Sequence, residues 1–277
     1  MKDINIVIVN YNMKDEIFTC LKTLYKEILQ CPFDVQVTVV DNNSDDGSVE
    51  YIKKEFPQVH CIPQEINVGF GKAQNIGMQS TDAKYYFALN PDALLHDGEN
   101  TITRLYNFME NHQYVGMVGP KIVYPDGSLQ YSCWRYPSIF QPFFQRTKLG
   151  QTKWGKKKVA YHHMKDYDHL RTIPVDAIMG SAMFVRKEAI EQVGMFDERY
   201  FMYYEDIDWS LSMWEKNWAV YYVHDIVLTH THGRGSAKVP GVFRALLKNR
   251  LARIHITSWI KFILKWHGVK KYYERVS

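Results

Sequence analysis

The chain has 277 residues, of which 46% are hydrophobic and 23% charged, with only 16 glycines and 10 prolines. This composition excludes disordered and fibrous proteins and predicts one large domain, or two small halves, around a buried core. The formal net charge is only +4, but residues 238–277 carry ten Lys or Arg and a single acid. An acidic body, 1–237, therefore precedes a basic tail.

The cysteines and the apolar runs predict where the protein resides. Its four cysteines (Cys20, Cys31, Cys61 and Cys133) form no metal-binding or redox spacing, which is typical of a reduced, cytosolic protein. The apolar run 4–9 is too short for the core of a signal peptide. No run of 18 apolar residues is present to span a membrane. We expect a cytoplasmic protein.

Strands and helices alternate over the first 95 residues. Runs rich in β-branched residues predict strands at 4–9, 35–40, 60–63 and 85–89. Apolar stripes at helical spacing and polar helix starts predict helices at 14–29, 48–55 and 71–79. This alternation implies crossover connections, hence a parallel sheet with helices on both faces.

Beyond residue 95 the pattern becomes mixed. It predicts a helix at 100–111, a short strand at 116–118, a turn at 125–127 and a strand at 219–228. Ile207, Leu211, Trp214 and Trp218 recur at helical spacing and predict an amphipathic helix. We interpret the polar stretch 145–172 as a mobile loop or excursion.

Polar clusters follow three of the predicted strands, at the edge where parallel sheets bind ligands. Asn10 and Asn12 follow the first strand, and Asp41 begins the cluster after the second. Asp41 has the chemistry to accept a hydrogen bond from the imide of uracil or thymine, or it simply caps a loop. In Asn90-Pro91-Asp92, Asp92 is suited to a divalent cation that bridges a diphosphate, or to a hydrogen-bonded turn.

Three further motifs are candidates for binding or catalysis. The glycines of 67–77 let a backbone approach a ligand, but their spacing fits neither a dinucleotide fingerprint nor a P-loop. The predicted helix at 205 has acids in its first turn, which suits a general base but also stabilises helices. His230 and His232 are either metal ligands or a surface pair.

Taken together, the motifs are similar to those of family 2 glycosyltransferases, in particular the rhamnosyltransferase-like branch. The resemblance covers residues 3–237 and is carried, in order, by 7–12, 40–44, 67–77, 89–92, 126–130 and 196–209. It implies the GT-A fold, an α/β nucleotide-binding mixed sheet with helices on both faces. We place the nucleotide-binding half at 1–95, the acceptor half at 96–237, and basic amphipathic helices in the tail, 238–277.

The resemblance also implies roles for individual residues. Asp206 matches the catalytic base, with Glu205 beside it. Asp92 matches the last acid of the family's Asp-x-Asp motif, which binds Mg²⁺ or Mn²⁺. Asn90 stands in place of the first acid, which leaves one fewer charged ligand. His230 matches the family's metal-binding histidine more closely than His232.

The remaining predicted site residues fall into two groups. The donor nucleotide is expected to contact Asn10, Asn12, Asp41, Asn43, Gly69, Asn75 and Asn90. The acceptor is expected to contact Tyr204, Asp208 and Trp209.

The predicted activity is inverting transfer of a sugar from a UDP- or dTDP-linked donor to a saccharide or polyprenyl-diphosphate-linked acceptor. The branch suggests rhamnose as the sugar and bacterial surface polysaccharide as the product. One alternative is a non-catalytic nucleotide-sugar-binding protein, which has no use for a base at position 206. The other is a nucleotide-dependent oxidoreductase, which the missing G-x-G-x-x-G after the first strand disfavours.

The tail alternates apolar and basic residues between 242 and 266, which predicts one or two basic amphipathic helices. We expect them to attach the protein peripherally to the inner face of the cell membrane. The alternative is a C-terminal helix packed on the body. Nucleic acid is not expected as a partner, because no recognition motif accompanies the charge.

Overall fold

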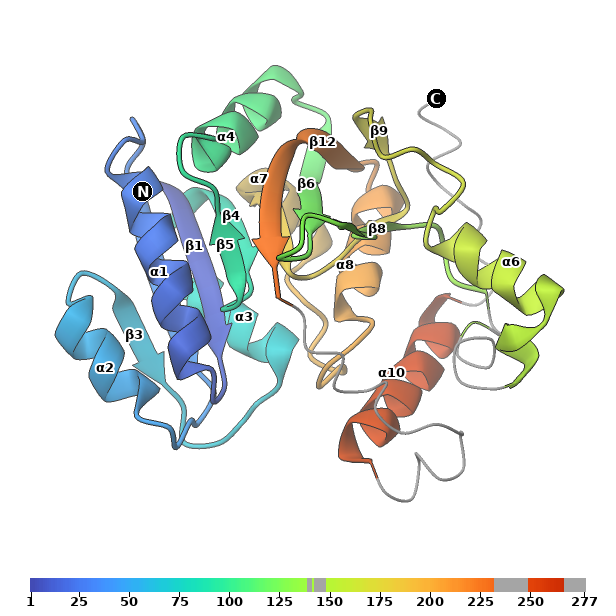
Figure 1. Ribbon diagram of the computed structural model, residues 1–277. Coiled ribbons are helices and arrows are strands. Elements are labelled where there is room, and N and C mark those ends of the chain that lie inside the picture. The colour runs from blue at the N-terminus through green and yellow to red at the C-terminus, as the bar shows by residue number, and fades with distance from the viewer. Residues whose placement is uncertain (139–140, 142–147, 232–248, 267–277) are drawn as a thin grey trace.

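The computed structural model describes residues 1–138, 141, 148–231 and 249–266 (Figure 1). Its strands are β1 (Lys2–Asn10), β2 (Val35–Asp41), β3 (His60–Pro63), β4 (Ala83–Leu89), β5 (Ala93–Leu95), β6 (Val115–Val123), β7 (Leu129–Gln130), β8 (Cys133–Trp134), β9 (Ile173–Pro174), β10 (Ala177–Ile178), β11 (Ala182–Arg186) and β12 (Ala219–His230). Its helices are α1 (Lys14–Ile28), α2 (Ser48–Glu55), α3 (Phe70–Gln79), α4 (Thr101–Asn111), α6 (Lys153–His162), α7 (Lys187–Val193), α8 (Glu205–Glu215) and α10 (Arg250–Trp266), with a 3-10 helix, η1, at Lys148–Gln151.

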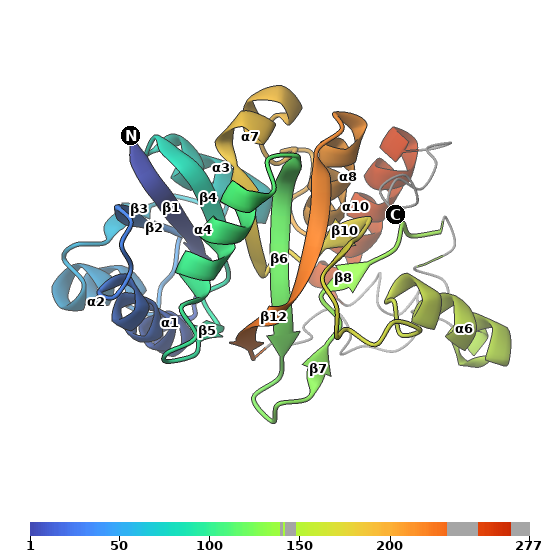
Figure 2. The same cartoon turned by 90° about the horizontal axis from the view of Figure 1, so that it is seen from above.

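A mixed sheet forms the centre of the protein. Its strands lie in the order β3-β2-β1-β4-β11-β6-β12-β5. The first four are parallel, while β11 runs antiparallel to both of its neighbours, β4 and β6. Helices α1, α2 and α4 cover one face and α3, α7 and α8 the other (Figure 2). The predicted mixed α/β sheet with helices on both faces is confirmed.

Burial explains why the first strands form. Seven consecutive residues of β1, from Ile4 to Asn10, are buried, because β1 lies between β2 and β4 and is covered on both faces. The register pairs Asn10 with Asp41 and Ile8 with Leu89. The polar residues that end these strands are therefore brought to one edge of the sheet.

Several predicted elements differ from the observed ones. The stretch 145–172, interpreted as a loop, contains η1 and α6. Trp218 lies beyond the end of α8, which stops at Glu215. Strand β11, in the middle of the sheet, was not predicted. The division of the body at residue 95 remains a prediction, and the sheet runs through both proposed halves.

The C-terminal helix α10 packs against the body. Phe262 is fully buried, Trp266 is nearly so, and Ser258 donates a hydrogen bond to Met202 O at 2.8 Å. The opposite face remains in solvent, where Leu264 is 78% exposed. Packing on the body thus accounts for one face of α10, while residues 242–248 of the predicted tail lie outside the described residues. Within the described ranges, no helix is both long and apolar enough to cross a bilayer.

Candidate active site

The loop after β2 is built around the carboxylate of Asp41, which is 1% exposed. Asn10 Nδ2 donates to Asp41 Oδ2 and Ser44 N donates to Asp41 Oδ1, each at 2.8 Å. These bonds fix the loop at the carboxyl ends of β1 and β2. Each carboxylate oxygen can accept a further bond, so contact with a nucleotide base stays a prediction.

Two predicted donor residues lie on the exposed rim of this loop. Asn12 adopts a left-handed conformation, φ 51°, and its Oδ1 accepts a hydrogen bond from Asp45 N at 2.9 Å. Asn43, φ 68°, is exposed and also left-handed. Tyr11, which sequence reasoning did not select as a site residue, is 47% exposed beside them. An exposed aromatic ring directly after a buried strand was the signal that could have found it.

A second loop is joined to the first by Asn42. This buried amide donates to Gly69 O and accepts from Val68 N, at 3.1 and 3.0 Å. Gly69 has φ 89°, and a Cβ there would lie 2.3 Å from Phe201 O. Only glycine therefore allows the start of α3 to approach the 196–204 segment, and Phe70 N donates to Phe201 O at 2.8 Å.

Asn75, expected to contact the donor, has its amide engaged within the protein. It donates to Phe196 O at 2.9 Å and accepts from Phe196 N at 3.0 Å. The side chain is 4% exposed. The geometry gives Asn75 the role of fastening α3 to the segment before α8, and its donor contact stays a prediction.

Asp92 and His230 lie together where β4 and β12 end. His230 Nε2 is 3.1 Å from Asp92 Oδ1 and also 3.1 Å from Asn90 Nδ2. Thr231 Oγ1 donates to Asp92 Oδ2 at 3.1 Å. Asn90, Asp92 and His230 are all site residues predicted from the sequence, and the structure brings their side chains together.

Gln130 orients the imidazole from the other side, since its Oε1 lies 3.0 Å from His230 Nδ1. An amide oxygen only accepts, so Nδ1 donates to Gln130 and Nε2 faces Asp92. At this distance Nε2 and the carboxylate share either a proton or a metal cation. Burial opposes ionisation of Asp92, but hydrogen bonding and charge from His230 hold its pKa below the ordinary value.

No set of three His, Cys, Asp or Glu residues close enough to share a metal ion occurs in the described ranges. The cluster offers one carboxylate and one imidazole, with an amide alongside. His232, the alternative ligand, lies outside the described residues, as do Arg234 and Lys238, basic residues that the sequence offers for contact with phosphate.

Asp206 is connected to this cluster through a short path of backbone contacts. Gly180 N donates to Asp206 Oδ2 at 2.9 Å, and Ser181 O accepts from Asn90 N at 2.9 Å. Ile207 N donates to Asp206 Oδ1 at 2.8 Å. The carboxylate thus lies at the first turn of α8, one loop away from Asp92 and His230.

The adjacent carboxyls of Glu205 and Asp206 have different environments. Burial and the nearby charge of Asp206 raise the pKa of Glu205 well above its ordinary value. Its Oε2 is buried and has no hydrogen-bond partner in the described part of the chain. Burial also raises the pKa of Asp206, but the amides of Gly180 and Ile207 oppose the shift. Asp206 is therefore the member of the pair that ionises first.

Two successive residues in the left-handed conformation precede α8 and set the direction in which the helix begins. Tyr203 and Tyr204 have φ values of 70° and 69°, unusual for two successive bulky residues. Phe201 O is held by α3 and Met202 O by α10. Strain of this kind persists only where surrounding contacts impose it, and it is common near functional groups.

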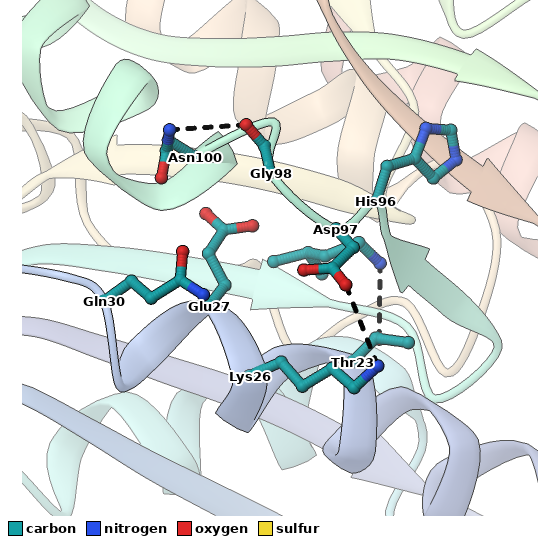
Figure 3. A pocket seen from close by; sticks show the side chains of 9 residues that line it. Thr23, Lys26, Glu27, Gln30, His96, Asp97, Gly98 and Asn100 are labelled. Carbon is teal, nitrogen blue, oxygen red and sulfur yellow. Dashed lines mark hydrogen bonds and ion pairs between the residues drawn. The ribbon is translucent and has the colours of Figure 1, made fainter.

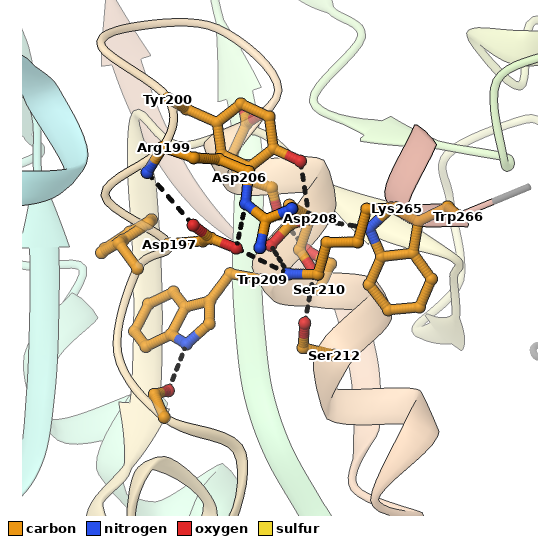
Figure 4. A network of polar contacts seen from close by, with 12 residues as sticks. Asp197, Arg199, Tyr200, Asp206, Asp208, Trp209, Ser210, Ser212, Lys265 and Trp266 are labelled. Carbon is orange, nitrogen blue, oxygen red and sulfur yellow. Dashed lines mark hydrogen bonds and ion pairs between the residues drawn. The ribbon is translucent and has the colours of Figure 1, made fainter. Parts of the chain in front are cut away.

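The three residues expected to bind the acceptor are buried. Trp209 is 1% exposed and donates to Gly194 O at 2.9 Å. The ring of Tyr204 contacts Phe262 of α10, with centroids 5.2 Å apart. Asp208 accepts hydrogen bonds from Tyr200, Lys265 and Trp266 (Figure 4). These contacts show that the three side chains pack within the protein. Their contact with an acceptor stays a prediction, and their burial does not favour it.

A cavity of about 120 Å³ lies elsewhere, between α1 and the connection from β5 to α4 (Figure 3). Its lining includes Lys26, Glu27 and Asp97 but none of the predicted site residues. Ligand sites commonly occupy roughly 300–1,000 Å³. The cavity is too small for a sugar nucleotide and is not the candidate site.

Comparison with known proteins agrees with this arrangement. Residues 5–194 match the sequence model of glycosyl transferase family 2. The chain is 30% identical over 237 residues to N-acetylglucosaminyl-diphospho-decaprenol L-rhamnosyltransferase of Mycobacterium tuberculosis, covering 82% of this chain and 74% of that protein. It is 27% identical to dTDP-rhamnosyl transferase RfbF of Shigella flexneri, covering 85% and 71%.

A solved mannosyltransferase from Pyrobaculum calidifontis, in complex with GDP-Man and Mn²⁺, has the same fold. The TM-score is 0.57 at 14% identity, covering 97% of this chain and 76% of that one. The GT-A expectation is therefore confirmed. The protein is a glycosyltransferase. It belongs to glycosyl transferase family 2, and its relatives place it in the rhamnosyltransferase-like branch.

Proposed function

We propose that the protein transfers a sugar, with inversion, from a nucleoside-diphosphate donor to a saccharide or polyprenyl-diphosphate-linked acceptor during synthesis of a surface polysaccharide. The contacts that carry this proposal join Asp206 to Gly180, and Ser181 to Asn90, so that a base and a cation site share one edge of the sheet. The relatives favour rhamnose, since one is named as a dTDP-rhamnosyl transferase and another as acting on a diphospho-decaprenol.

Asp206 acts as the general base. Its Oδ2 and Oδ1 accept from Gly180 N and Ile207 N, which orients the carboxylate and favours its ionised form. It takes the proton of the acceptor hydroxyl while that oxygen attacks the anomeric carbon from the face opposite the diphosphate. One displacement inverts the configuration without a covalent intermediate.

Asp92 and His230 fit a divalent cation, Mg²⁺ or Mn²⁺. Carboxylate oxygen and imidazole nitrogen are both ligands that Mn²⁺ accepts, and Gln130 turns Nε2 of His230 toward Asp92. When bound, the cation would stabilise charge on the departing diphosphate. The loops around Asp41 and Gly69 provide amides and side chains that can hold the nucleoside.

We also propose that α10 brings the protein to the membrane that holds a lipid-linked acceptor. Its outer face carries Arg250, Arg253, Ile260 and Leu264, all exposed. Such a combination favours the interface of an anionic bilayer. Deleting the helix would remove Phe262 and Trp266 and expose the part of the body that they cover, so the test is I260S/L264S in the full chain. Loss of vesicle binding supports this contact, and unchanged binding refutes it.

The donor can be tested by thermal shift with UDP- and dTDP-sugars, with and without Mn²⁺. A ligand that binds the native state raises Tm, and at a fixed concentration a tighter ligand raises it further. We expect one donor class to raise Tm, and Mn²⁺ to enlarge the shift. D92A should lose the part of the Tm shift that depends on Mn²⁺. No shift with any donor, or a full Mn²⁺ effect in D92A, would refute the proposed site.

A further inference from the structure

Helix α6 is a firmly anchored platform at the periphery of the molecule. Thr152 caps its start by accepting a hydrogen bond from Gly155 N at 3.1 Å. Gly155 packs so closely on η1 that a Cβ there would lie 2.1 Å from Leu149 O. The first turn of α6 therefore cannot shift without breaking these contacts.

The last turn of α6 is anchored as well. His162 is 6% exposed, its Nδ1 lies 2.8 Å from Arg135 O, and its ring stacks on Trp134. Burial lowers the pKa of His162 to about 3, so the imidazole is neutral. The inner face of α6 thus serves packing and carries no charge.

The outer face of α6 is basic and aromatic. Trp154, Lys157, Lys158 and Tyr161 follow the spacing i, i+3, i+4, i+7 and share one side of the helix. Trp154 is 57% and Tyr161 38% exposed, and both lysines are exposed. Residues 149–165 contain five lysines and no acid. Within the described part of the chain, the α6 lysines form no ion pair.

We propose that this face of α6 binds the surface of an anionic lipid bilayer and forms a second membrane contact. The lysines pair with lipid phosphates, while Trp154 and Tyr161 lie at the level of the headgroups, where amphipathic rings are favoured. A convex helix face with interleaved rings and flexible cations suits a fluid surface better than a shaped protein partner. The inference rests on the proposed function, which places the acceptor in a membrane.

The position of α6 agrees with this proposal. Helices α6 and α10 both lie in the half of the molecule away from α1 and α2 (Figures 1 and 2). The segment 134–136 links them, since Arg135 N donates to His162 O at 2.9 Å and Tyr136 OH donates to Trp266 O at 2.7 Å. Two helices joined in this way, on the same side of the molecule, can both meet one bilayer.

The test is flotation of the full-length chain with vesicles of phosphatidylcholine alone or enriched in phosphatidylglycerol. We expect binding to the anionic vesicles only. K157Q/K158Q should weaken it by roughly tenfold or more, since each lysine near an anionic surface contributes about 1 kcal/mol. W154S should weaken it on its own. The matched control K53Q/K54Q removes the same charge from exposed positions of α2 and should bind as wild type does.

Two outcomes would overturn the proposal. One is equal binding by K157Q/K158Q and K53Q/K54Q, and the other is preference of the α6 face for RNA or an acidic protein over vesicles. Donor-induced thermal shifts show that each variant is folded. Transfer to a detergent-solubilised acceptor separates the two hypotheses. If the wild type fails there, the proposed function fails, whereas an α6 variant should keep its activity in detergent.

Discussion

Lys265 Nζ lies 2.7 Å from Asp208 Oδ2, and this pair fastens α10 to the helix that begins with Glu205 and Asp206. Asp208 is 1% exposed and also accepts hydrogen bonds from Tyr200 and Trp266, at 2.9 and 2.7 Å. Burial raises the pKa of Asp208, and Lys265 opposes the shift. The C-terminal helix is therefore part of the support of the candidate base (Figure 4).

Replacing Lys265 tests this support. K265M leaves Asp208 buried without its cation, so we expect a loss of about 2–4 kcal/mol in the free energy of unfolding. K261M, on the same helix, should lower the free energy of unfolding much less. Urea denaturation measures both. The double variant D208N/K265M should recover part of the loss, and equal stabilities of K265M and K261M would contradict the account.

Glu27 gives the protein a dependence of stability on pH. Burial raises its pKa to about 7, against a hydrogen bond from Ile102 N at the start of α4. The folded state thus favours the protonated acid. The contribution of Glu27 to the free energy of unfolding is fully present below about pH 4.5, the ordinary pKa of a glutamate. It is lost as the pH rises through about 7.

E27Q, an isostere of the protonated acid, should remove this dependence. We expect the fall in Tm from about pH 5 to about pH 8 to be shallower in E27Q than in wild type. Glu16, exposed on the same helix, is the control, and E16Q should follow the wild-type curve. Parallel curves for E27Q and wild type would show that Glu27 does not titrate in this range.

Gln130 should tune the cation site without touching the donor. Q130L removes the acceptor that orients His230 Nδ1, so we expect Mn²⁺ affinity to fall roughly 10- to 100-fold. The measurement is the Mn²⁺ concentration that gives half of the donor-induced shift in Tm. Q36L, in β2, is the matched control. A half-saturation concentration unchanged by Q130L would argue against His230 as a ligand.

The sequence predicted the elements of the first 95 residues well because their signals are local. Helix 48–55 and strand 60–63 were predicted with their observed bounds, because the sequence switches sharply between polar and apolar residues at the ends of these elements. α6 was taken for a loop because its lysines and single tryptophan give no apolar stripe. β11 was missed because its five buried residues show no alternation and, unlike those of β1, include only one β-branched residue, Val185.

The candidate site was predicted in part for a similar reason. Asp92 and Asp206 follow from motifs, and their positions at strand and helix ends bring them to one edge. Two of the three partners of Asp208, Lys265 and Trp266, are 57 and 58 residues away, in a tail that nothing in the local pattern connects to α8. Gln130 likewise gains its role only through a contact made 100 residues further along the chain.

The central claim is that Asp206 removes the acceptor proton, and D206N tests it most directly. The measurement is turnover with the donor identified by thermal shift, beside E215Q at the far end of α8. We predict that D206N binds donor and Mn²⁺ as wild type does but loses at least about 10²- to 10⁴-fold in kcat, while E215Q stays near wild type. Turnover by D206N close to that of E215Q would contradict the account.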